Sequence, residues 1–205
     1  MEAVKQVGID LGLKTFITLS TGEKIELPWW LKATEKEINK IDYQLRLGTI
    51  SKWRKVELKK QLADKTDLFS NHFDHFIRLT AQRIISEFDF IGLESLNILA
   101  MIDANEMNNA QILKHTKWDK FIKYLKLYAQ DTDKQIVFID QYKPSSKRCC
   151  KCGYINRELQ LSDRKWDCPQ CKNHQDRDRG AAINVLYYAI EQQKSINNQS
   201  TLIQN

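Results

Sequence analysis

The sequence predicts an α/β fold in which helices flank a mixed sheet and a small cysteine-rich module precedes the last helix. Short apolar segments of strand length open the chain and recur at 88–93 and 135–139. Longer segments with apolar residues at helical spacing separate these strands. All five cysteines of the 205-residue chain fall between positions 149 and 171. Strands that alternate with helices are typical of α/β sheets, and clustered cysteines indicate a module of their own.

The first 27 residues are expected to form an antiparallel meander of three strands. Val7 and Ile9 lie at alternating positions in the first strand. An apolar second strand is predicted at 16–19, followed by a Thr-Gly turn at 21–22. The third strand, at 24–27, returns from this turn.

Helical spacing dominates the middle of the chain. Two polar helices are predicted within 32–65, with a break at 48–51. A stronger amphipathic helix is predicted over 67–87. Its apolar stripe consists of Phe69, Phe73, Phe76, Thr80 and Ile84. The strand at 88–93 follows and ends at Glu94.

The rest of the chain is less regular. The segment 95–115 is polar and rich in asparagine, and its sequence predicts no particular element. A helix at 117–130 and a strand at 135–139 follow. A last helix is expected from Asp178 to about Gln192, and then a polar tail.

Composition excludes several classes of protein. No run of about 18 apolar residues is present, so no membrane-spanning helix is expected. The start of the chain lacks the apolar core of a secretory signal. The net charge is +6, and residues 142–179 hold ten Lys/Arg against five Asp/Glu, a net of +5. This concentration favours a polyanion as partner, although a solvated lysine-rich face would also account for it.

The cysteine spacing predicts a zinc site. Cys149 and Cys152 form one Cys-x-x-Cys pair, and Cys168 and Cys171 form a second after an intervening stretch. Two such pairs supply four thiolates for one tetrahedral ion, and a closed Cys₄ site is structural. Cys150 is then the spare cysteine. The alternatives are His174 in place of one cysteine, or four reduced cysteines that hold no metal.

Three carboxylates occupy positions that could converge. Asp10 ends the first strand, Glu94 ends the fourth, and Asp178 opens the last helix. Ligands of open α/β sheets bind beyond strand ends, so these side chains could form one site. Taken singly, each also has a structural explanation, because acids favour turns and helix N-termini.

Three segments together resemble a known family. They are VGIDLGLK at 7–14, IGLESLN at 91–97, and SSKRCCKCG to QDRDRGAAINVL at 145–186. The resemblance is to the TnpB/OrfB family of transposon-encoded proteins and to the RuvC domain of type V CRISPR effectors. It implies an RNase-H-like mixed sheet flanked by helices, with an inserted zinc ribbon. The expected domains are a nuclease domain at 1–141 and 174–192, a zinc ribbon at 142–173, and a polar tail at 193–205.

The resemblance assigns roles to the acids. Asp10, Glu94 and Asp178 map onto the catalytic acids of the family, with Asp176 as the second choice for the third position. Carboxylate oxygens suit two Mg²⁺ or Mn²⁺ ions, and Asp10 is expected to bridge them. One departure concerns the third motif, where Gly180 stands in place of the usual asparagine and puts activity in question.

The implied function is a metal-dependent DNA endonuclease guided by RNA in the cytoplasm of a prokaryote. Candidate phosphate contacts on the ribbon are Lys147, Arg148, Lys151, Arg164 and Lys165. Only nine residues precede Asp10, so the N-terminal recognition lobe of the family is expected to be absent here and to be supplied by a separate protein. The alternatives are a nucleic-acid-binding module that does not cleave, and a decayed fragment of a transposon protein.

Overall fold

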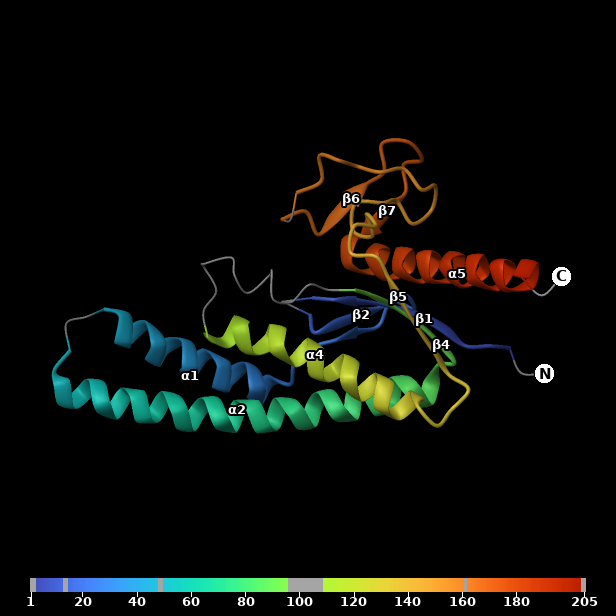
Figure 1. Ribbon diagram of the computed structural model, residues 1–205. Coiled ribbons are helices and arrows are strands. Elements are labelled where there is room, and N and C mark those ends of the chain that lie inside the picture. Colours follow the sequence, from blue (N-terminus) through green and yellow to red (C-terminus); the bar gives the residue numbers. More distant parts are fainter. Residues whose placement is uncertain (1–2, 13–14, 48–49, 96–108, 161, 204–205) are drawn as a thin grey trace. The chain divides into compact units, whose positions relative to one another are not determined.

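The computed structural model describes residues 3–12, 15–47, 50–95, 109–160 and 162–203, which form two compact units (Figure 1). The first unit comprises Met1–Glu26, Ile85–Leu96 and Ala129–Asn205, and the second comprises Leu27–Ile84 and Asn97–Tyr128. The cysteine module is thus part of the unit that holds the main sheet. The helices of 27–84 and 97–128, expected to belong to one domain with that sheet, pack as a unit of their own.

The first unit is built on a mixed five-stranded sheet. Its strands are β1 (Gln6–Leu11), β2 (Ile17–Leu19), β3 (Lys24–Ile25), β4 (Phe90–Glu94) and β5 (Gln135–Ile139), in the spatial order β3-β2-β1-β4-β5. The pairs β3–β2 and β2–β1 are antiparallel, whereas β1–β4 and β4–β5 are parallel. The predicted meander and the two later strands are therefore confirmed, as is the mixed α/β class.

A helix and a small sheet complete this unit. Helix α5 (Arg177–Ile203) lies along one face of the main sheet, and β6 (Lys165–Asp167) pairs antiparallel with β7 (His174–Asp176) (Figure 1). The core between sheet and helix is apolar and includes Phe90, Val137, Ile139, Val185 and Ala189. Burial of each large side chain contributes about 1.5–3 kcal/mol. Helix α5 extends beyond the predicted end near Gln192 into the expected polar tail, because no glycine or proline interrupts 181–203.

Two glycines let α5 approach the sheet closely. Gly8 of β1 and Gly92 of β4 are paired in register. A Cβ atom on Gly8 would lie 2.1 Å from the carbonyl oxygen of Ala182, and one on Gly92 would lie 2.9 Å from the Cβ of Ala189. Neither position can hold a larger residue unless the helix moves. The helix fits closely against these glycines, since Ala182 and Ala189 are small and fully buried.

The second unit is helical. It contains α1 (Trp29–Arg46), most of α2 (Lys52–Glu87) and α4 (Asn109–Ala129). The sequence predicts two helices within 52–87, but α2 is continuous because the residues around 65 include no glycine or proline. Its buried stripe is Phe69, Phe73, Ile77, Thr80 and Ile84, so Ile77 replaces the predicted Phe76. Most of the unassigned segment 95–115 lies outside the described residues, and 109–115 belong to α4.

A polar contact joins α2 to α4 within this unit. Asp74 of α2 accepts hydrogen bonds from Lys120 Nζ at 2.7 Å and from the Tyr124 hydroxyl at 2.9 Å, both on α4. Trp118, Phe121 and other apolar residues of α4 are buried beside these polar groups. Among the described residues, no helix is long and apolar enough to cross a bilayer.

The close packing at Gly8 and Gly92 predicts that an added methyl group destabilises the protein more at Gly8 than at Gly92. Gly8→Ala should lower the free energy of unfolding by about 3 kcal/mol or more, because its Cβ meets backbone atoms of α5. Gly92→Ala should cost about 1–2 kcal/mol, because its nearest neighbour is the methyl group of Ala189. Urea unfolding followed by circular dichroism measures both values. Equal costs for the two variants would contradict the close packing of α5 on β1.

Candidate functional site

Adjacent parallel strands bring two of the predicted acids together. Ile9 of β1 and Leu93 of β4 are paired in register, and Asp10 and Glu94 each come one residue later. Side chains alternate along a strand, so Asp10 shares a face with Gly8, and Glu94 shares a face with Gly92. This is the face on which α5 packs. Both carboxylates therefore lie at the C-terminal edge of the parallel strands, beside α5.

The third predicted acid lies on the first turn of that helix. Asp178 precedes Ala182 by four residues, so both occupy the stripe of α5 that faces the sheet. The Asp178 carboxylate pairs with the Arg164 guanidinium at 3.2 Å. Its negative charge acts on Asp10, as described below.

The second choice for the third acid, Asp176, is occupied differently. One of its oxygens accepts the backbone N–H of Arg179 at 3.0 Å, as expected of an N-cap, and the other pairs with Lys24 Nζ at 2.7 Å. Burial raises the pKa of Asp176, but the hydrogen bonds from Lys24 and Arg179 outweigh this effect, so the net shift is downward. These contacts favour a structural role for Asp176 and leave Asp178 as the better candidate.

Burial and neighbouring charges shift the pKa of two of the three predicted acids. Burial raises the pKa of Asp10 well above its ordinary value, and the negative charges of Glu94 and Asp178 raise it further. The guanidinium groups of Arg177 and Arg164 act in the opposite direction. Burial also raises the pKa of Glu94. Asp10 and Glu94 are thus held where burial disfavours their charged forms, and a bound cation would offset this effect.

The three carboxylates lie farther apart than the four cysteine sulfurs do. Among the described residues, the only group of three or more His, Cys, Asp or Glu side chains with ligand atoms within 4.8 Å of one another is the cysteine cluster. The oxygens of Asp10, Glu94 and Asp178 are thus farther apart than a shared ion requires. Their oxygen donors nevertheless fit Mg²⁺ or Mn²⁺ by chemical type.

Two residues that the sequence analysis did not predict support Glu94. Ser145 bonds it directly, and Asn184 bonds the backbone of Ser145. The Ser145 hydroxyl donates a hydrogen bond to a Glu94 carboxylate oxygen, which lowers the pKa of Glu94 against the effect of burial. Asn184 of α5 is fully buried, and its amide nitrogen donates to the carbonyl oxygens of Ser145 at 2.8 Å and Arg148 at 2.7 Å. The Arg148 guanidinium in turn donates to the Asn184 amide oxygen at 2.7 Å. The sequence signal for Asn184 was a single polar residue within the otherwise apolar run 181–186, which indicates a buried polar group that needs partners.

The cysteine module contains two turns of the same geometry. In each, the first cysteine donates its N–H to the carbonyl five residues later, and the N–H four residues later donates to that cysteine's carbonyl. The four distances are 2.7 Å for Cys149–Tyr154, 3.0 Å for Gly153–Cys149, 3.0 Å for Cys168–Asn173 and 2.9 Å for Lys172–Cys168. The fourth residue after each first cysteine has positive φ, 80° at Gly153 and 58° at Lys172. Lysine there costs about 1–2 kcal/mol relative to a right-handed conformation.

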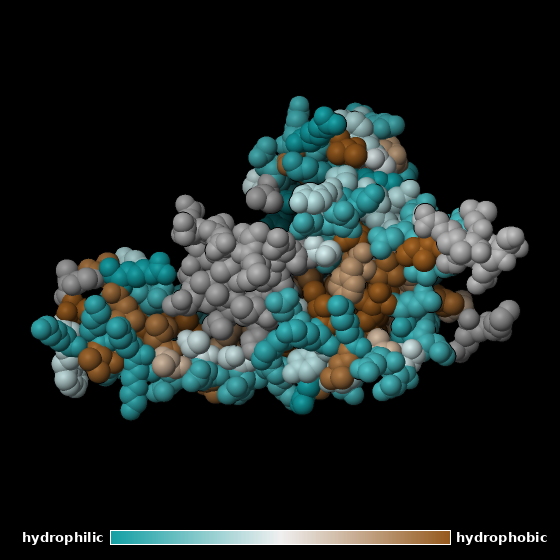
Figure 2. Space-filling model, viewed as in Figure 1, coloured by the Kyte–Doolittle hydropathy of each residue, from teal (hydrophilic) through white to brown (hydrophobic). Residues whose placement is uncertain are grey.

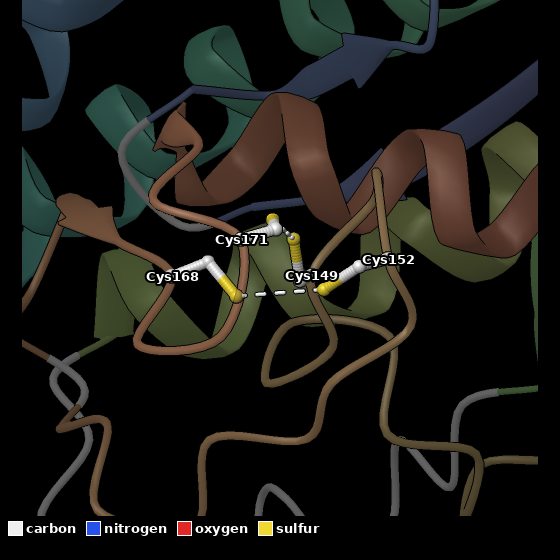
Figure 3. Close-up of side chains that lie close together, drawn as sticks. All are labelled: Cys149, Cys152, Cys168 and Cys171. Atoms are coloured by element: carbon white, nitrogen blue, oxygen red, sulfur yellow. Dashed lines mark hydrogen bonds between the residues drawn. The ribbon is translucent and has the colours of Figure 1, made fainter.

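These turns place four sulfur atoms together (Figure 3). The Cys149 and Cys171 sulfurs are 3.6 Å apart, as are those of Cys152 and Cys168, and all four lie within 4.8 Å of one another. A disulfide needs a separation of about 2.0 Å, whereas the edge of a tetrahedron with Zn–S bonds of about 2.3 Å is roughly 3.8 Å. The spacing therefore fits a metal site. Cys150 stands apart, and its N–H donates to the side chain of Gln175.

The thiols also resemble a metal site electrostatically. Burial raises the pKa of Cys149, but hydrogen bonds from the N–H groups of Cys152 and Lys151 outweigh it and lower this pKa to about 7. At Cys152 the N–H of Tyr154 favours the thiolate, but desolvation and the surrounding thiols raise its pKa to about 12. Four neighbouring sulfurs cannot all ionise unless a cation compensates their charge.

The five predicted phosphate contacts have different surroundings. Lys147, Lys151 and Lys165 are exposed on the module. Arg164 is exposed and pairs with Asp178. Arg148 is half-buried and lies over the Tyr187 ring at 4.2 Å, in addition to its bond with Asn184. Arg148 therefore has a structural contribution that the sequence analysis did not assign.

Comparison with protein families gives two matches. The OrfB_IS605 model, described as a probable transposase, matches residues 1–105, just over half of the chain. The model of the Cas12f1-like TNB domain matches residues 118–185 and so includes all four cysteines of the cluster.

Curated relatives align over most of the chain. A Streptomyces pristinaespiralis protein named provisionally as an RNA-guided DNA endonuclease is 26% identical over 88% of this chain and 44% of its own length. A Mycobacterium tuberculosis protein with the same provisional name is 22% identical over 89% of this chain and 41% of its own length. A TnpB-like protein of Acanthamoeba polyphaga mimivirus is 24% identical over 90% of this chain and 37% of its own length. The chain thus spans less than half of each relative.

Solved structures share the fold. A CRISPR-Cas12f ternary complex aligns with a TM-score of 0.59 and 17% identity over 90% of this chain and 39% of that chain. A Cas12f1 complex with single-guide RNA and target DNA aligns with a TM-score of 0.55 and 16% identity over 91% of this chain and 51% of that chain. The family resemblance predicted from the three sequence motifs is confirmed, and the chain belongs to the OrfB family of IS605-type transposons, the family of the TnpB-like proteins.

Proposed function

We propose that this chain is the cleaving part of an RNA-guided DNA endonuclease, with Asp10, Glu94 and Asp178 as its metal-binding catalytic acids. The observation that carries the proposal is the pairing of β1 with β4, which places Asp10 and Glu94 at one edge of the sheet beside α5, whose first turn contains Asp178. Burial, together with the charges of Glu94 and Asp178, raises the pKa of Asp10. Family membership supports it, because relatives of this chain are named as RNA-guided DNA endonucleases. The strand order β3-β2-β1-β4-β5 supports an RNase-H-like assignment of the fold.

The proposed reaction is hydrolysis of a phosphodiester by water, with release of the 3′ oxygen of the neighbouring nucleotide. Two Mg²⁺ or Mn²⁺ ions would supply charge neutralisation at the phosphate and acidify the attacking water. The charges of both other acids act on Asp10, which makes it the candidate for a shared ligand. Ser145 orients Glu94 through its hydroxyl. Arg164 pairs with Asp178 at 3.2 Å and supplies a positive charge beside this acid.

We assign one structural zinc ion to Cys149, Cys152, Cys168 and Cys171, in a module that we interpret as a zinc ribbon. The support is the pair of equivalent turns and the 3.6 Å sulfur separations. Four thiolates fill a tetrahedral site and leave no position for water, so this zinc would not take part in the reaction.

Guide and target recognition would involve more than this chain. The relatives extend well beyond the aligned part, which is 44% of the Streptomyces protein. We propose that guide RNA and target DNA are held partly by a recognition lobe equivalent to that remainder. The chain would then contribute the cleavage site and part of the nucleic-acid surface.

The competing function is nucleic-acid binding without cleavage. Gly180 motivates it, because the family has asparagine at that position. The structure offers a local reason for glycine there, since a Cβ would lie 3.2 Å from the Gln175 side-chain oxygen. All three acids are present, which favours cleavage over this alternative.

A pair of neighbouring substitutions tests the third acid. Asp178→Ala should reduce cleavage of circular single-stranded DNA by at least about a hundredfold in Mg²⁺ or Mn²⁺, because a metal ligand is lost. Asp176→Ala should instead lower stability by about 1 kcal/mol, through loss of the N-cap, and retain cleavage. Gel-based cleavage and unfolding assays measure these effects, and mobility shifts should show that both variants bind DNA. The reverse pattern would transfer the role to Asp176.

The raised pKa of Asp10 predicts a dependence of stability on pH. Its folded pKa lies above its unfolded value, so ionisation lowers the stability of the metal-free protein as pH rises through the folded pKa. Asp10→Asn cannot ionise and should have a higher Tm than wild type at pH 8 in zinc-containing, magnesium-free buffer. The difference should shrink toward pH 4. The exposed Asp131→Asn serves as control, and an Asp10→Asn protein less stable than wild type at pH 8 would contradict the burial argument.

The zinc assignment predicts that substitutions of Cys152 and of Cys150 have different effects on zinc content. Wild-type protein should contain one zinc per chain by elemental analysis, and Cys152→Ser should lose it because only three thiolates remain. Cys150→Ser should retain zinc, since Cys150 is outside the cluster. Strong chelators should also lower the Tm of wild type and of Cys150→Ser. Zinc loss in the Cys150 variant alone would show that the ligands are assigned incorrectly.

A further inference from the structure

The second unit presents an unusual surface at the turn between α1 and α2. We call it the hairpin tip and define it as Tyr43 and Leu47 of α1 together with residues 52–56 of α2. All five residues of 52–56 are exposed. Trp53 is 76% exposed, Val56 68% and Tyr43 64%. Large side chains at this exposure indicate a contact surface more often than a solvated helix end.

The hairpin tip is also strongly basic. The first nine residues of α2, 52–60, contain five Lys/Arg and one Glu, a net of +4. The following 24 residues, 61–84, contain three of each and are neutral. Arg54 pairs with Glu57 at 2.7 Å, which leaves Lys52 and Lys55 as exposed cations beside Trp53. Figure 2 shows hydrophobic and hydrophilic surface interleaved over this end of the hairpin, at the left of the view.

This combination favours a polynucleotide over a protein partner. Cores of protein interfaces are depleted in lysine, whereas here lysines alternate with the aromatic and apolar side chains. Surfaces for unpaired nucleic acid combine basic groups for the phosphates with aromatic rings on which bases stack. Trp53 between Lys52 and Arg54 supplies both elements within one helical turn.

We propose that the hairpin tip binds an unpaired stretch of the guide RNA, with Trp53 stacked on a base and Lys52 and Lys55 at phosphates. The inference rests on the proposed function, which supplies the RNA. It commits to RNA because the proposed function already gives the DNA a contact at the candidate acids, whereas no contact with the guide RNA has been assigned. The ribbon lysines of the first unit are thus not the whole nucleic-acid surface of the chain.

Binding of the full chain to a fluorescent 20-nucleotide single-stranded RNA tests this inference. The buffer contains zinc but no magnesium, so the outcome does not depend on cleavage. Trp53→Ala should weaken RNA binding about tenfold through loss of stacking. The double variant Lys52→Gln/Lys55→Gln should reduce the slope of log Kd against log salt by about 1.4, because two phosphate contacts are lost.

Matched controls come from the same unit. Trp29→Ala removes a tryptophan that is 80% exposed but about 27 Å along α1 from the hairpin tip, and it should bind RNA as wild type does. Lys123→Gln/Lys126→Gln removes two exposed charges from α4 and should leave most of the salt slope unchanged. Circular dichroism confirms that each variant is folded.

Three results would overturn the proposal. The first is wild-type RNA affinity in Trp53→Ala together with an unchanged slope in the lysine variant. The second is a loss confined to single-stranded DNA of the same sequence. The third is binding of the hairpin tip to anionic lipid vesicles with no effect on RNA. A chain that binds RNA through the hairpin tip but cleaves nothing would support this inference and contradict the proposed function.

Discussion

The close contact between α5 and the paired glycines of β1 and β4 is the constraint on which the candidate site depends. Because Gly8 and Gly92 carry no side chain, α5 packs so closely that its atoms lie 2.1 Å and 2.9 Å from where their Cβ atoms would be. Asp10 and Glu94 come two residues after these glycines on the same face, and Asp178 comes four residues before the alanine that contacts Gly8. A helix held a few ångströms farther away would remove Asp178 from the field of Asp10. Packing and chemistry therefore have one structural cause.

The same helix connects the acids to the cysteine module. Asn184 is on α5, and its amide bonds the carbonyl oxygens of both Ser145 and Arg148. Ser145 reaches Glu94, and Arg148 immediately precedes the first zinc-ligand candidate, Cys149. Loss of the Asn184 amide would leave buried carbonyl groups without donors, at about 1–3 kcal/mol each. The module is thus joined to the acid site by a continuous set of hydrogen bonds.

Much of this arrangement could be predicted from sequence, and the failures have physical causes. Apolar segments of strand length predicted the five strands of the main sheet, and the cysteine spacing predicted the four thiols that lie together. The single helix α2 was missed, because a polar stretch around residue 65 resembles a break although nothing in it stops a helix. The roles of Ser145 and Asn184 could not be assigned from the sequence. The contact of Ser145 with Glu94, and that of Asn184 with the Ser145 carbonyl oxygen, depend on the three-dimensional path of 140–148 and not on any local pattern.

The glycines illustrate the limit most clearly. In the sequence, Gly8 and Gly180 are equivalent small residues beside an acid, and only the second one departs from the family motif. In the structure, Gly8 is the position at which a side chain is harder to accommodate. A Cβ on Gly8 would meet backbone at 2.1 Å, whereas one on Gly180 would meet the end of the Gln175 side chain at 3.2 Å. A side-chain amide can shift by a few tenths of an ångström more easily than a helix backbone, so an added Cβ would cost less at Gly180 than at Gly8. Gln175 is nevertheless buried and its oxygen accepts the N–H of Cys150, so the glycine at 180 fits its local packing, which the motif comparison alone does not reveal.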